Sequence, residues 1–317
     1  MMIKALITYD NILPLSDLSN NFKSIDFVFE TKISRIHELI KDAEIFICDG
    51  KLFNSKLANI IKINKRLKWI QMCSAGVDHV TEANLPKHIR ISRGGGIRNS
   101  PVAEHVIGMI YSLLRRIHHC GDDRKNKLWK NEFHSKRVDV IEGKRVLILG
   151  FGEIGETIYY KVTALGMNAI GISTKSKKIN NIKVKSINSL YSELQKSDIL
   201  VMSLPKNIST NNIIGNAEIN IMKKGSYIIN VGRGNTLDLE AVYNALENEH
   251  LSGVALDVTE PEPLPTDHPL WTLPNVLITP HIAGESPNST DMIYKLINTN
   301  IKFYLAGKKL KYEICYK

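Results

Sequence analysis

Three glycines, Gly150, Gly152 and Gly155, directly follow the apolar run at residues 146–149 and open a helix-like stretch at residues 154–165. In the pattern G-x-G-x-x-G between a strand and a helix, the glycines allow a tight turn and a close approach of the backbone to a pyrophosphate. The N-terminus of the helix attracts the same anion through its free N–H groups. The motif therefore predicts a dinucleotide-binding unit; the alternative is a glycine-rich turn that only packs a helix on a strand.

The end of the second strand of this unit bears on the choice between NAD and NADP. An NAD site typically has an acidic residue there, roughly 20 residues after the glycines, which binds the ribose hydroxyls. This chain instead has Ser173, Thr174 and Lys175, and no Asp or Glu lies between Glu156 and Glu193. Hydroxyls and lysines would hold a 2'-phosphate that a carboxylate would repel. The acid-free stretch contains six lysines: Lys161, Lys175, Lys177, Lys178, Lys183 and Lys185.

These residues predict NADP(H) as the favoured cofactor, with Ser173, Thr174 and Lys175 as contacts, while NAD(H) stays open. The alternative is that the lysines form a solvated face in a lysine-rich protein.

Short apolar runs alternate with amphipathic stretches along the chain, which predicts a parallel-sheet α/β protein. In the first third we expect one small α/β domain with a helix near residues 34–41 and strands at residues 3–8, 45–48 and 69–71. From Lys144 onward we expect six strands with helical crossovers, a doubly wound fold. These strands are expected at residues 145–149, 168–173, 199–204, 226–231, 253–258 and 276–279, and further helices at residues 239–248 and 291–305.

A long helix is expected between the two groups of strands. Ser100 is a suitable N-cap, and Pro101 suits the first helical position. Residues 102–119 then have the pattern of one continuous helix that ends in a basic turn near Gly121. Such a helix could carry the chain from one domain to the next.

Composition sets the class of protein. A length of 317 residues suggests two domains, and 43% apolar with 23% charged residues is typical of a globular chain. The scattered cysteines Cys48, Cys73, Cys120 and Cys315 fit free thiols in a reducing compartment. Because we find neither a signal peptide nor a membrane span, we expect a cytoplasmic protein. The net charge of +10 is compatible with nucleic acid, an anionic membrane or an acidic small molecule, or with a general lysine bias.

Three chemically useful side chains follow the later strands. Arg233 lies in Val-Gly-Arg-Gly after one strand, Glu262 lies in Glu-Pro-Glu-Pro-Leu after the next, and His281 lies in Thr-Pro-His-Ile-Ala-Gly after the last. The carboxyl ends of parallel strands meet at one edge of the sheet, where such folds bind their ligands. We therefore expect these three residues on adjacent loops of one face.

The order of these motifs resembles the D-isomer-specific 2-hydroxyacid dehydrogenase family over nearly the whole length. The matching segments are residues 73–79 (CSAGVDH), 102–105 (VAEH), 150–155 (GFGEIG), 230–234 (NVGRG), 255–258 (ALDV), 262–265 (EPLP) and 279–284 (TPHIAG). The resemblance implies a Rossmann-type dinucleotide domain at residues 99–285. It also implies a smaller flavodoxin-like substrate domain built from residues 1–98 and 286–317, with the substrate held between the domains.

The resemblance also implies site residues. Arg233, Glu262 and His281 carry over as the catalytic set, with His281 as the acid, Glu262 as its partner and Arg233 as the substrate-carboxylate ligand. Glu260 is a rival for the acidic role. The substrate-binding set is Arg233, His281 and the loop Ser74, Ala75, Gly76 and Val77, and Arg98 could add a carboxylate contact. The cofactor-binding set is Gly150, Gly152, Glu153, Ile154, Gly155, Ser173, Thr174, Lys175, Leu204, Pro205, Thr210, Val231, Gly232, Asp257 and Gly284; a capping role is the alternative for Asp257.

The expected reaction is NADPH-dependent reduction of a small 2-oxo acid, such as glyoxylate or hydroxypyruvate, to the D-2-hydroxy acid. The alternatives are an NADH-dependent enzyme for another 2-oxo acid, a nucleotide-sensing corepressor or scaffold like the C-terminal-binding proteins, and a formate dehydrogenase. The resemblance implies a homodimer through the segment of Trp129, because in related glyoxylate and hydroxypyruvate reductases a Trp from this region can reach the neighbouring subunit; an ordinary interface or core anchor is the alternative for this residue. We expect no metal, since His105, His118, His119 and His134 lack a zinc motif, and no nucleic-acid or membrane partner.

Overall fold

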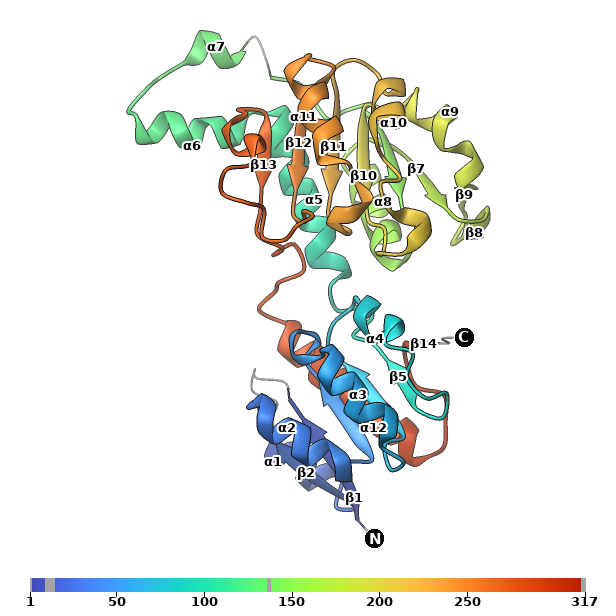
Figure 1. Ribbon diagram of the computed structural model, residues 1–317. Helices are drawn as coiled ribbons and strands as arrows, with labels where there is room; N and C mark the ends of the chain where they lie inside the picture. The colour runs from blue at the N-terminus through green and yellow to red at the C-terminus, as the bar shows by residue number, and fades with distance from the viewer. Residues whose placement is uncertain (1, 9–14, 136–137, 315–317) are drawn as a thin grey trace. The chain divides into compact units, whose positions relative to one another are not determined.

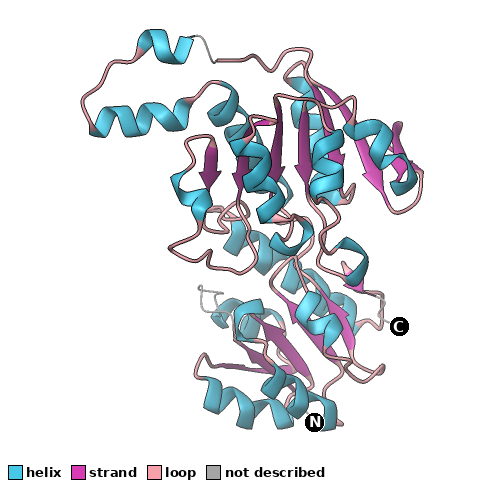
Figure 2. Ribbon diagram, turned by 45° about the horizontal axis from the view of Figure 1, so that its top comes forward, coloured by secondary structure: helices cyan, strands magenta, loops and turns pink. Residues whose placement is uncertain are grey.

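The computed structural model describes residues 2–8, 15–135 and 138–314, and the chain divides into two compact units (Figure 1). Unit 1 comprises Met1–Arg98 and Ser286–Lys317, and unit 2 comprises Asn99–Glu285. Each unit has one largely parallel sheet with helices along it (Figure 2). The predicted α/β class is therefore confirmed. In the described part of the chain, no helix combines the length and the apolar character needed to cross a membrane.

The sheet of unit 1 has six strands in the order β14-β5-β4-β3-β1-β2, and only β14 is antiparallel to its neighbour. The order of the parallel strands is that of the flavodoxin-like fold. Three of the strands were not expected: β2 is a short amphipathic segment, β5 has only three residues, and β14 has only two. The bounds are β1 (Ile3–Ile7), β2 (Ile25–Phe29), β3 (Ile45–Cys48), β4 (Trp69–Met72), β5 (Arg90–Ser92) and β14 (Glu313–Ile314).

Helices cover both faces of this sheet, and each face has its own apolar core. One core contains residues of α2, α3 and α4, and the other contains residues of α1 and α12. A buried polar network also joins α12 to the sheet: Asn300 Nδ2 donates to Gln71 Oε1 at 2.8 Å, and Ser92 Oγ donates to the same oxygen at 2.7 Å. The bounds are α1 (Leu15–Asn21), α2 (Ile33–Leu39), α3 (Ser55–Ile63), α4 (Asp78–Glu82) and α12 (Ser289–Leu305).

The sheet of unit 2 has eight strands in the order β13-β12-β11-β10-β6-β7-β9-β8. The chain runs from β6 to β7 on one side and later returns to β10 on the other side of β6, so the strand order reverses between β6 and β10. Ligands of doubly wound sheets bind at this point. The bounds are β6 (Arg145–Leu149), β7 (Asn168–Ser173), β8 (Lys177–Ile179), β9 (Ile182–Ser186), β10 (Ile199–Met202), β11 (Ser226–Asn230), β12 (Leu251–Leu256) and β13 (Val276–Ile278).

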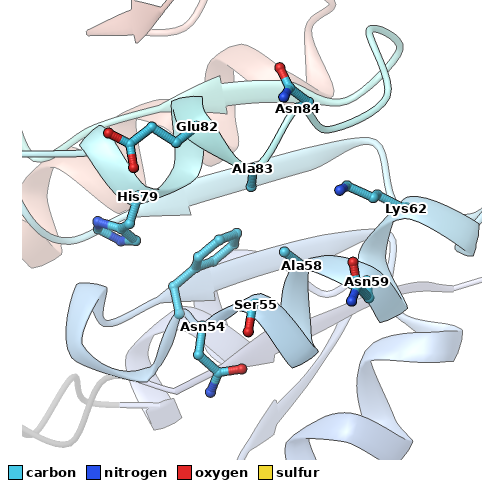
Figure 3. A pocket seen from close by; sticks show the side chains of 10 residues that line it. Asn54, Ser55, Ala58, Asn59, Lys62, His79, Glu82, Ala83 and Asn84 are labelled. Atoms are coloured by element: carbon cyan, nitrogen blue, oxygen red, sulfur yellow. The ribbon is translucent and has the colours of Figure 1, made fainter. Parts of the chain in front are cut away.

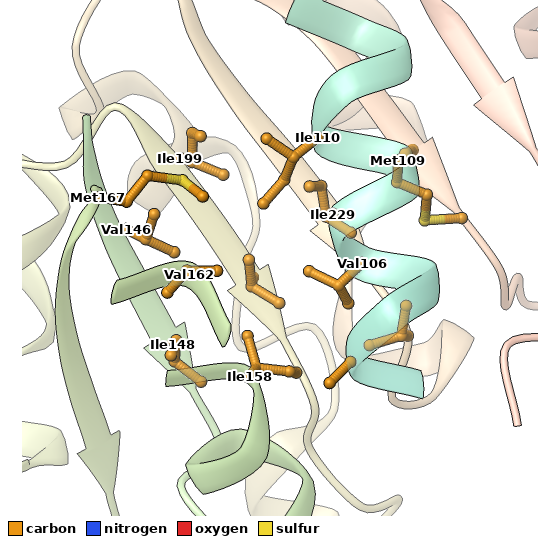
Figure 4. Close-up of a cluster of buried hydrophobic side chains, with 14 of the residues drawn as sticks. Val106, Met109, Ile110, Val146, Ile148, Ile158, Val162, Met167, Ile199 and Ile229 are labelled. Atoms are coloured by element: carbon orange, nitrogen blue, oxygen red, sulfur yellow. The ribbon is translucent and has the colours of Figure 1, made fainter. Parts of the chain in front are cut away.

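Two helices pack on one face of this sheet and three on the other. Figure 4 shows Val106 and Ile110 of α5 facing Ile158 and Val162 of α8 above the strands. The opposite core is formed with α9, α10 and α11. The bounds are α5 (Asn99–Leu114), α8 (Glu153–Ala164), α9 (Leu190–Leu194), α10 (Asn216–Ile221) and α11 (Leu239–Glu247).

Short 3-10 helices occur in both units. In unit 1 they are η1 (Ile40–Asp42) and η2 (Gly50–Leu52), and in unit 2 they are η3 (Ile187–Ser189), η4 (Ile208–Thr210), η5 (Gly234–Thr236) and η6 (Pro269–Thr272).

The prediction of one long helix over residues 102–119 was wrong in extent. Helix α5 already begins at Asn99 and ends at Leu114, and a separate helix α6 (Ile117–Lys125) follows. Arg116 between them has a left-handed φ of 58°, which closes the first helix. Gly121 lies inside α6 rather than after it, and α7 (Asn131–Ser135) comes next. The apolar face of α5 is buried, whereas no described residue of α6 is, so packing stops where the helix breaks.

The lysine-rich stretch forms the hairpin of β8 and β9, which extends the expected six strands to eight. Asn180 and Asn181 form its two-residue turn with φ values of 45° and 69°, as a type I' turn requires. Ile182 and Val184 are buried in the core of unit 2, while Lys183 between them is exposed. Lysine is uncommon in strands, so only the alternation of lysine with isoleucine and valine could have predicted β9.

Candidate functional site

The glycine-rich turn connects β6 to α8 at the reversal of strand order. Gly150 has a φ of 99°, and a Cβ there would approach the carbonyl carbon and oxygen of Ser203 to 2.8 Å. A Cβ on Gly155 would overlap the carbonyl oxygen of Gly150. A Cβ on Gly152, the N-cap of α8, would instead meet no atom within 4 Å. Two glycines thus permit close packing, and the third leaves open space.

The open space lies where the first turn of α8 presents its N–H groups, beginning with Glu153 and Ile154. A Cβ on Gly152 would occupy this space, and the macrodipole of the twelve-residue helix favours an anion there. The residues present therefore fit the pyrophosphate of a dinucleotide.

The predicted 2'-phosphate contacts lie at the end of β7. Ser173 Oγ donates to the carbonyl oxygen of Lys175 at 2.7 Å, and Thr174 and Lys175 are exposed. Two of the six lysines are already used elsewhere, because Lys161 pairs with Glu104 at 3.1 Å and Lys185 with Glu193 at 2.7 Å. Within the described part of the chain, the other four make no ion pair: Lys175, Lys177, Lys178 and Lys183.

Glu193 comes from α9, outside the acid-free stretch, and its side chain is fully buried. Burial favours the neutral acid, but hydrogen bonds from Lys185 and Arg145 outweigh it and hold the pKa of Glu193 below its usual value. Arg145 Nη2 lies 2.5 Å from Glu193 Oε2. This buried carboxylate links β6, β9 and α9.

The loop after β10 lies against the glycine-rich turn. Ser203 Oγ donates to the carbonyl oxygen of Gly150 at 2.7 Å. Thr210, which is buried, donates to the carbonyl oxygen of Pro205 at 2.8 Å and so closes this loop internally. A Cβ on Gly232 would lie 2.6 Å from the nitrogen of Leu204, so the loop after β11 also approaches closely. Among the other predicted cofactor residues, Val231 and Gly284 are buried.

Arg233 precedes η5, and the turn that carries it is fixed by Asn230. The side chain of Asn230 is fully buried: its Oδ1 accepts from the N–H of Gly232 at 3.0 Å, and its Nδ2 donates to the carbonyl oxygen of Arg233 at 3.1 Å. Thr236 Oγ1 donates to the same carbonyl oxygen at 2.7 Å. Arg233 Nη1 donates to the carbonyl oxygen of Gly232 at 2.8 Å.

His281 and Glu262 are in direct contact. His281 Nδ1 lies 2.6 Å from Glu262 Oε1, with 50% and 44% of the two side chains exposed. The rival Glu260 instead lies 3.6 Å from Lys206 Nζ. Since an ionised carboxylate only accepts hydrogen bonds, the contact is satisfied when Nδ1 carries a proton. The imidazole Nε2 is then left for another partner.

Asp257 holds the loop that carries His281. Its Oδ1 accepts from the N–H of Ile282 at 2.9 Å and from Thr279 Oγ1 at 2.7 Å, and its Oδ2 accepts from the N–H of Ala283 at 3.0 Å. His105 Nε2 lies 3.0 Å from Thr279 Oγ1. Both carboxylate oxygens of Asp257 are thus engaged within unit 2, which agrees with the alternative capping role.

The contributions of Asn230, Thr279 and His105 were missed from the sequence. For Asn230 a signal existed, because an asparagine at the end of a strand and before glycine commonly fixes a turn through its own side chain. Thr279 and His105 are 174 residues apart, and no local pattern indicates their contact.

In unit 1, the predicted substrate loop is ordered by its own hydrogen bonds. Ser74 Oγ donates to the carbonyl oxygen of Gly76 at 2.8 Å, and the loop leads through Val77, the N-cap residue, into α4. The carbonyl oxygen of Ser74 accepts from the N–H of Gly94 at 2.8 Å. Burial raises the pKa of the neighbouring Cys73 thiol, and the charge of Arg98 partly opposes this. Ala75 completes the loop, and the contact of Arg98 with the substrate carboxylate stays a prediction.

A cavity of about 290 Å³ lies between α3 and α4 of the same unit (Figure 3). Phe53, Ala58 and Ala83 form its apolar part, with Lys62 and Glu82 among the charged residues at its rim. No residue of the predicted loop at 74–77 lines it.

The remaining predictions concern metal and assembly. Among the described residues, no group of three or more His, Cys, Asp or Glu side chains could hold a metal ion. Trp129, between α6 and α7, is 92% exposed. No partner chain is part of the structure, so its role at an interface stays a prediction.

A doubly wound unit with a glycine-rich turn at its switch point defines a class of dinucleotide-binding proteins. The profile described as "D-isomer specific 2-hydroxyacid dehydrogenase, NAD binding domain" matches residues 107–283. The chain belongs to the D-isomer specific 2-hydroxyacid dehydrogenase family, as its motifs suggested.

Relatives within this family carry different names. D-3-phosphoglycerate dehydrogenase of Methanocaldococcus jannaschii is 29% identical over 97% of this chain, which spans only 58% of that protein. Glyoxylate reductase of Thermofilum pendens is 28% identical over 85% of this chain and 80% of its own length. A crystal structure of a family member from Aeromonas salmonicida, 26% identical, covers 100% of this chain and 99% of its own with a TM-score of 0.83.

Proposed function

We propose that this chain reduces a small 2-oxo acid of the glyoxylate or hydroxypyruvate type to the D-2-hydroxy acid, with NADPH as the hydride donor. The observation that carries the proposal is the 2.6 Å contact between His281 and Glu262. It joins an imidazole and a carboxylate on loops that follow neighbouring strands of the sheet, β13 and β12. The glyoxylate reductase among the relatives supports the substrate class.

In the proposed mechanism, the bound cofactor supplies the hydride for C2 of the substrate. Glu262 accepts a hydrogen bond from Nδ1–H of His281, orients the ring and stabilises its charged form. His281 then donates the proton on Nε2 to the carbonyl oxygen as that oxygen gains electrons. Arg233 binds the substrate carboxylate and polarises the C2 oxygen.

Two further groups complete the proposal. Backbone N–H groups of residues 74–77 cradle the substrate carboxylate, since a glycine-containing turn can present several donors to one anion. Asp257 keeps the loop of His281 in place through the three hydrogen bonds that its carboxylate accepts.

The catalytic part is tested with the matched pair Glu262→Gln and Glu260→Gln. An amide cannot stabilise the imidazolium, so Glu262→Gln is expected to lower kcat/KM for glyoxylate about 100-fold, within the range for general acid–base groups. Glu260→Gln, which removes only an exposed contact with Lys206, is expected to stay near the wild type. Equal kcat/KM values for the two variants would refute the assigned roles.

The cofactor part is supported by the four lysines around β8 that make no ion pair in the described part of the chain. Lys175→Ala is expected to lower kcat/KM with NADPH about tenfold and to leave the value with NADH unchanged, because a charged hydrogen bond to phosphate is lost. Lys161→Ala is the control, since its ammonium group is bound to Glu104. A wild type that prefers NADH would reject this part and favour an NADH-dependent enzyme; absence of turnover of any 2-oxo acid would favour a nucleotide sensor.

We also propose a cytosolic homodimer. Cys48 and Cys73 are buried free thiols and Cys120 is an exposed one, which suits a reducing compartment; Cys315 lies outside the described residues. The dimer proposal is supported by apolar side chains exposed around α6 and α7, including Trp129.

A further inference from the structure

Tyr312 adopts a backbone conformation that an aromatic residue rarely has. Its φ is 54°, in the left-handed region that favours glycine and asparagine. The residues on either side impose it. Lys311 N–H donates to Asn300 Oδ1 at 2.7 Å, and the carboxylate of Glu313 accepts from Arg90 Nε at 2.9 Å and Nη2 at 2.8 Å. Strain of this kind persists only where the surroundings enforce it.

The ring of Tyr312 packs on a run of three glycines, Gly94–Gly96. A Cβ on Gly95 would overlap the ring of Tyr312, and a Cβ on Gly96 would lie 2.5 Å from its hydroxyl oxygen. The guanidinium carbon of Arg93 lies 5.6 Å from the ring centre, and Arg93 N–H donates to the carbonyl oxygen of Tyr312 at 3.1 Å. The aromatic ring and the glycine backbone are therefore in direct contact.

The first glycine of the run, Gly94, is hydrogen-bonded to the loop at residues 74–77. Gly94 N–H donates to the carbonyl oxygen of Ser74 at 2.8 Å, and a Cβ on Gly94 would overlap the carbonyl oxygen of Cys73. Gly50 closes the other side, since a Cβ there would lie 2.7 Å from Ser74 Oγ. The loop thus has little room to move unless the glycine run moves too.

We propose that Tyr312 is a positioning residue: its ring fixes the turn at Gly94–Gly96, and this turn fixes the loop at residues 74–77 for the substrate carboxylate. The inference rests on the proposed function, which assigns that loop to the carboxylate. It adds a residue near the C-terminal end of the chain to the determinants of substrate binding.

The test compares Tyr312→Asn with Tyr312→Phe in the full-length protein. Asparagine tolerates the left-handed region, so the first variant removes the ring without adding backbone strain. We expect KM for glyoxylate to rise about tenfold with kcat and the Kd for NADPH little changed, as a displaced binding loop would produce. Tyr312→Phe retains the ring and should restore the wild-type KM. The unfolding temperature of each variant shows whether the fold is intact.

Amide hydrogen exchange supplies a readout that needs no activity. In Tyr312→Asn, the Gly94 amide should exchange faster than in the wild type and in Tyr312→Phe, because its bond to Ser74 opens more often. A raised KM without faster exchange, or faster exchange with an unchanged KM, overturns the proposal. If the wild type reduces no 2-oxo acid, the proposed function fails, and the exchange result alone decides whether Tyr312 holds the loop.

Discussion

The sequence has glycine at positions 152 and 171 for different reasons, although one glycine lies in the glycine-rich turn and the other packs against it. At Gly171 in β7 a Cβ would overlap the ring of Phe151, the buried residue between Gly150 and Gly152. At Gly152 a Cβ would meet no atom within 4 Å. Gly171 is therefore required for packing within the protein, whereas Gly152 leaves open space at the start of α8.

Alanine at the two positions should separate stability from binding. Gly171→Ala is expected to lower the free energy of unfolding by about 1–3 kcal/mol through overpacking. Gly152→Ala is expected to change it by less than about 1 kcal/mol, because its extended backbone (φ −95°) accepts alanine. Urea unfolding without cofactor measures both.

Cofactor titration completes this comparison. We expect Gly152→Ala to raise the Kd for the dinucleotide about tenfold, since its methyl group occupies the space of the pyrophosphate. Wild-type affinity in this variant would show that the open space does not hold the cofactor.

At the residue level, the sequence predicted one contact between side chains of the site and missed a larger network. The expected pairing of Glu262 with His281 is present as a contact, although their catalytic roles stay predictions. The network of Asp257, Thr279 and His105 was not foreseen, because its hydrogen bonds join segments that only the folded sheet brings together.

Among the elements, the strands of unit 2 with continuous apolar runs were predicted within two residues at each end. The hairpin of β8 and β9 was not, because charged residues mask the alternation that Ile182 and Val184 supply. The break after α5 was missed for another reason. No glycine or proline marks it, and Arg116 takes the left-handed conformation without such a signal.

Glu193 connects this hairpin to β6, and the loss of stability on replacing Glu193 should depend on pH. Its folded pKa is below the ordinary value of 4.5, so its contribution to stability is present above about pH 4.5 and is lost as pH falls through the folded pKa. Glu193→Gln is expected to cost about 3 kcal/mol at pH 7, as for one partner of a buried ion pair. The difference from the wild type should narrow below pH 4.5.

Urea unfolding of both proteins between pH 3 and pH 7 measures this dependence. Glu247→Gln on the exposed face of α11 is the control and should follow the wild type at every pH. A difference between Glu193→Gln and the wild type that widens on acidification would contradict the assigned role.

For the whole molecule, the exposed apolar residues around α6 and α7 predict a dimer. They are Ile117, Leu128, Trp129, Phe133, Val138 and Val140. Trp129→Ser is expected to shift the mass measured by light scattering from two chains to one, since a tryptophan that becomes buried between two subunits often contributes most of the binding energy. Ile63→Ser changes a side chain of α3 that is 80% exposed and should leave the dimer intact. A monomeric wild type would remove the dimer proposal.

Periodicity predicted the α/β class of both units, whereas the flavodoxin-like character of the first came from resemblance. The local pattern is weak there, because β5 has three residues and β14 two. Such short strands are stabilised by neighbours distant in sequence, as in the pairing of Glu313 with Ser92.

The order of segments in unit 1 has a consequence for synthesis. Residues 1–98 are synthesised before unit 2, but α12 and β14, which help to cover one face and complete one edge of their sheet, are synthesised after it. Until then Gln71 lacks the hydrogen bond from Asn300, and the apolar face that α1 and α12 share is only partly covered. Unit 2 is one continuous segment and can fold as soon as it has left the ribosome. The first domain can therefore be completed only after the whole segment that forms the second has been synthesised.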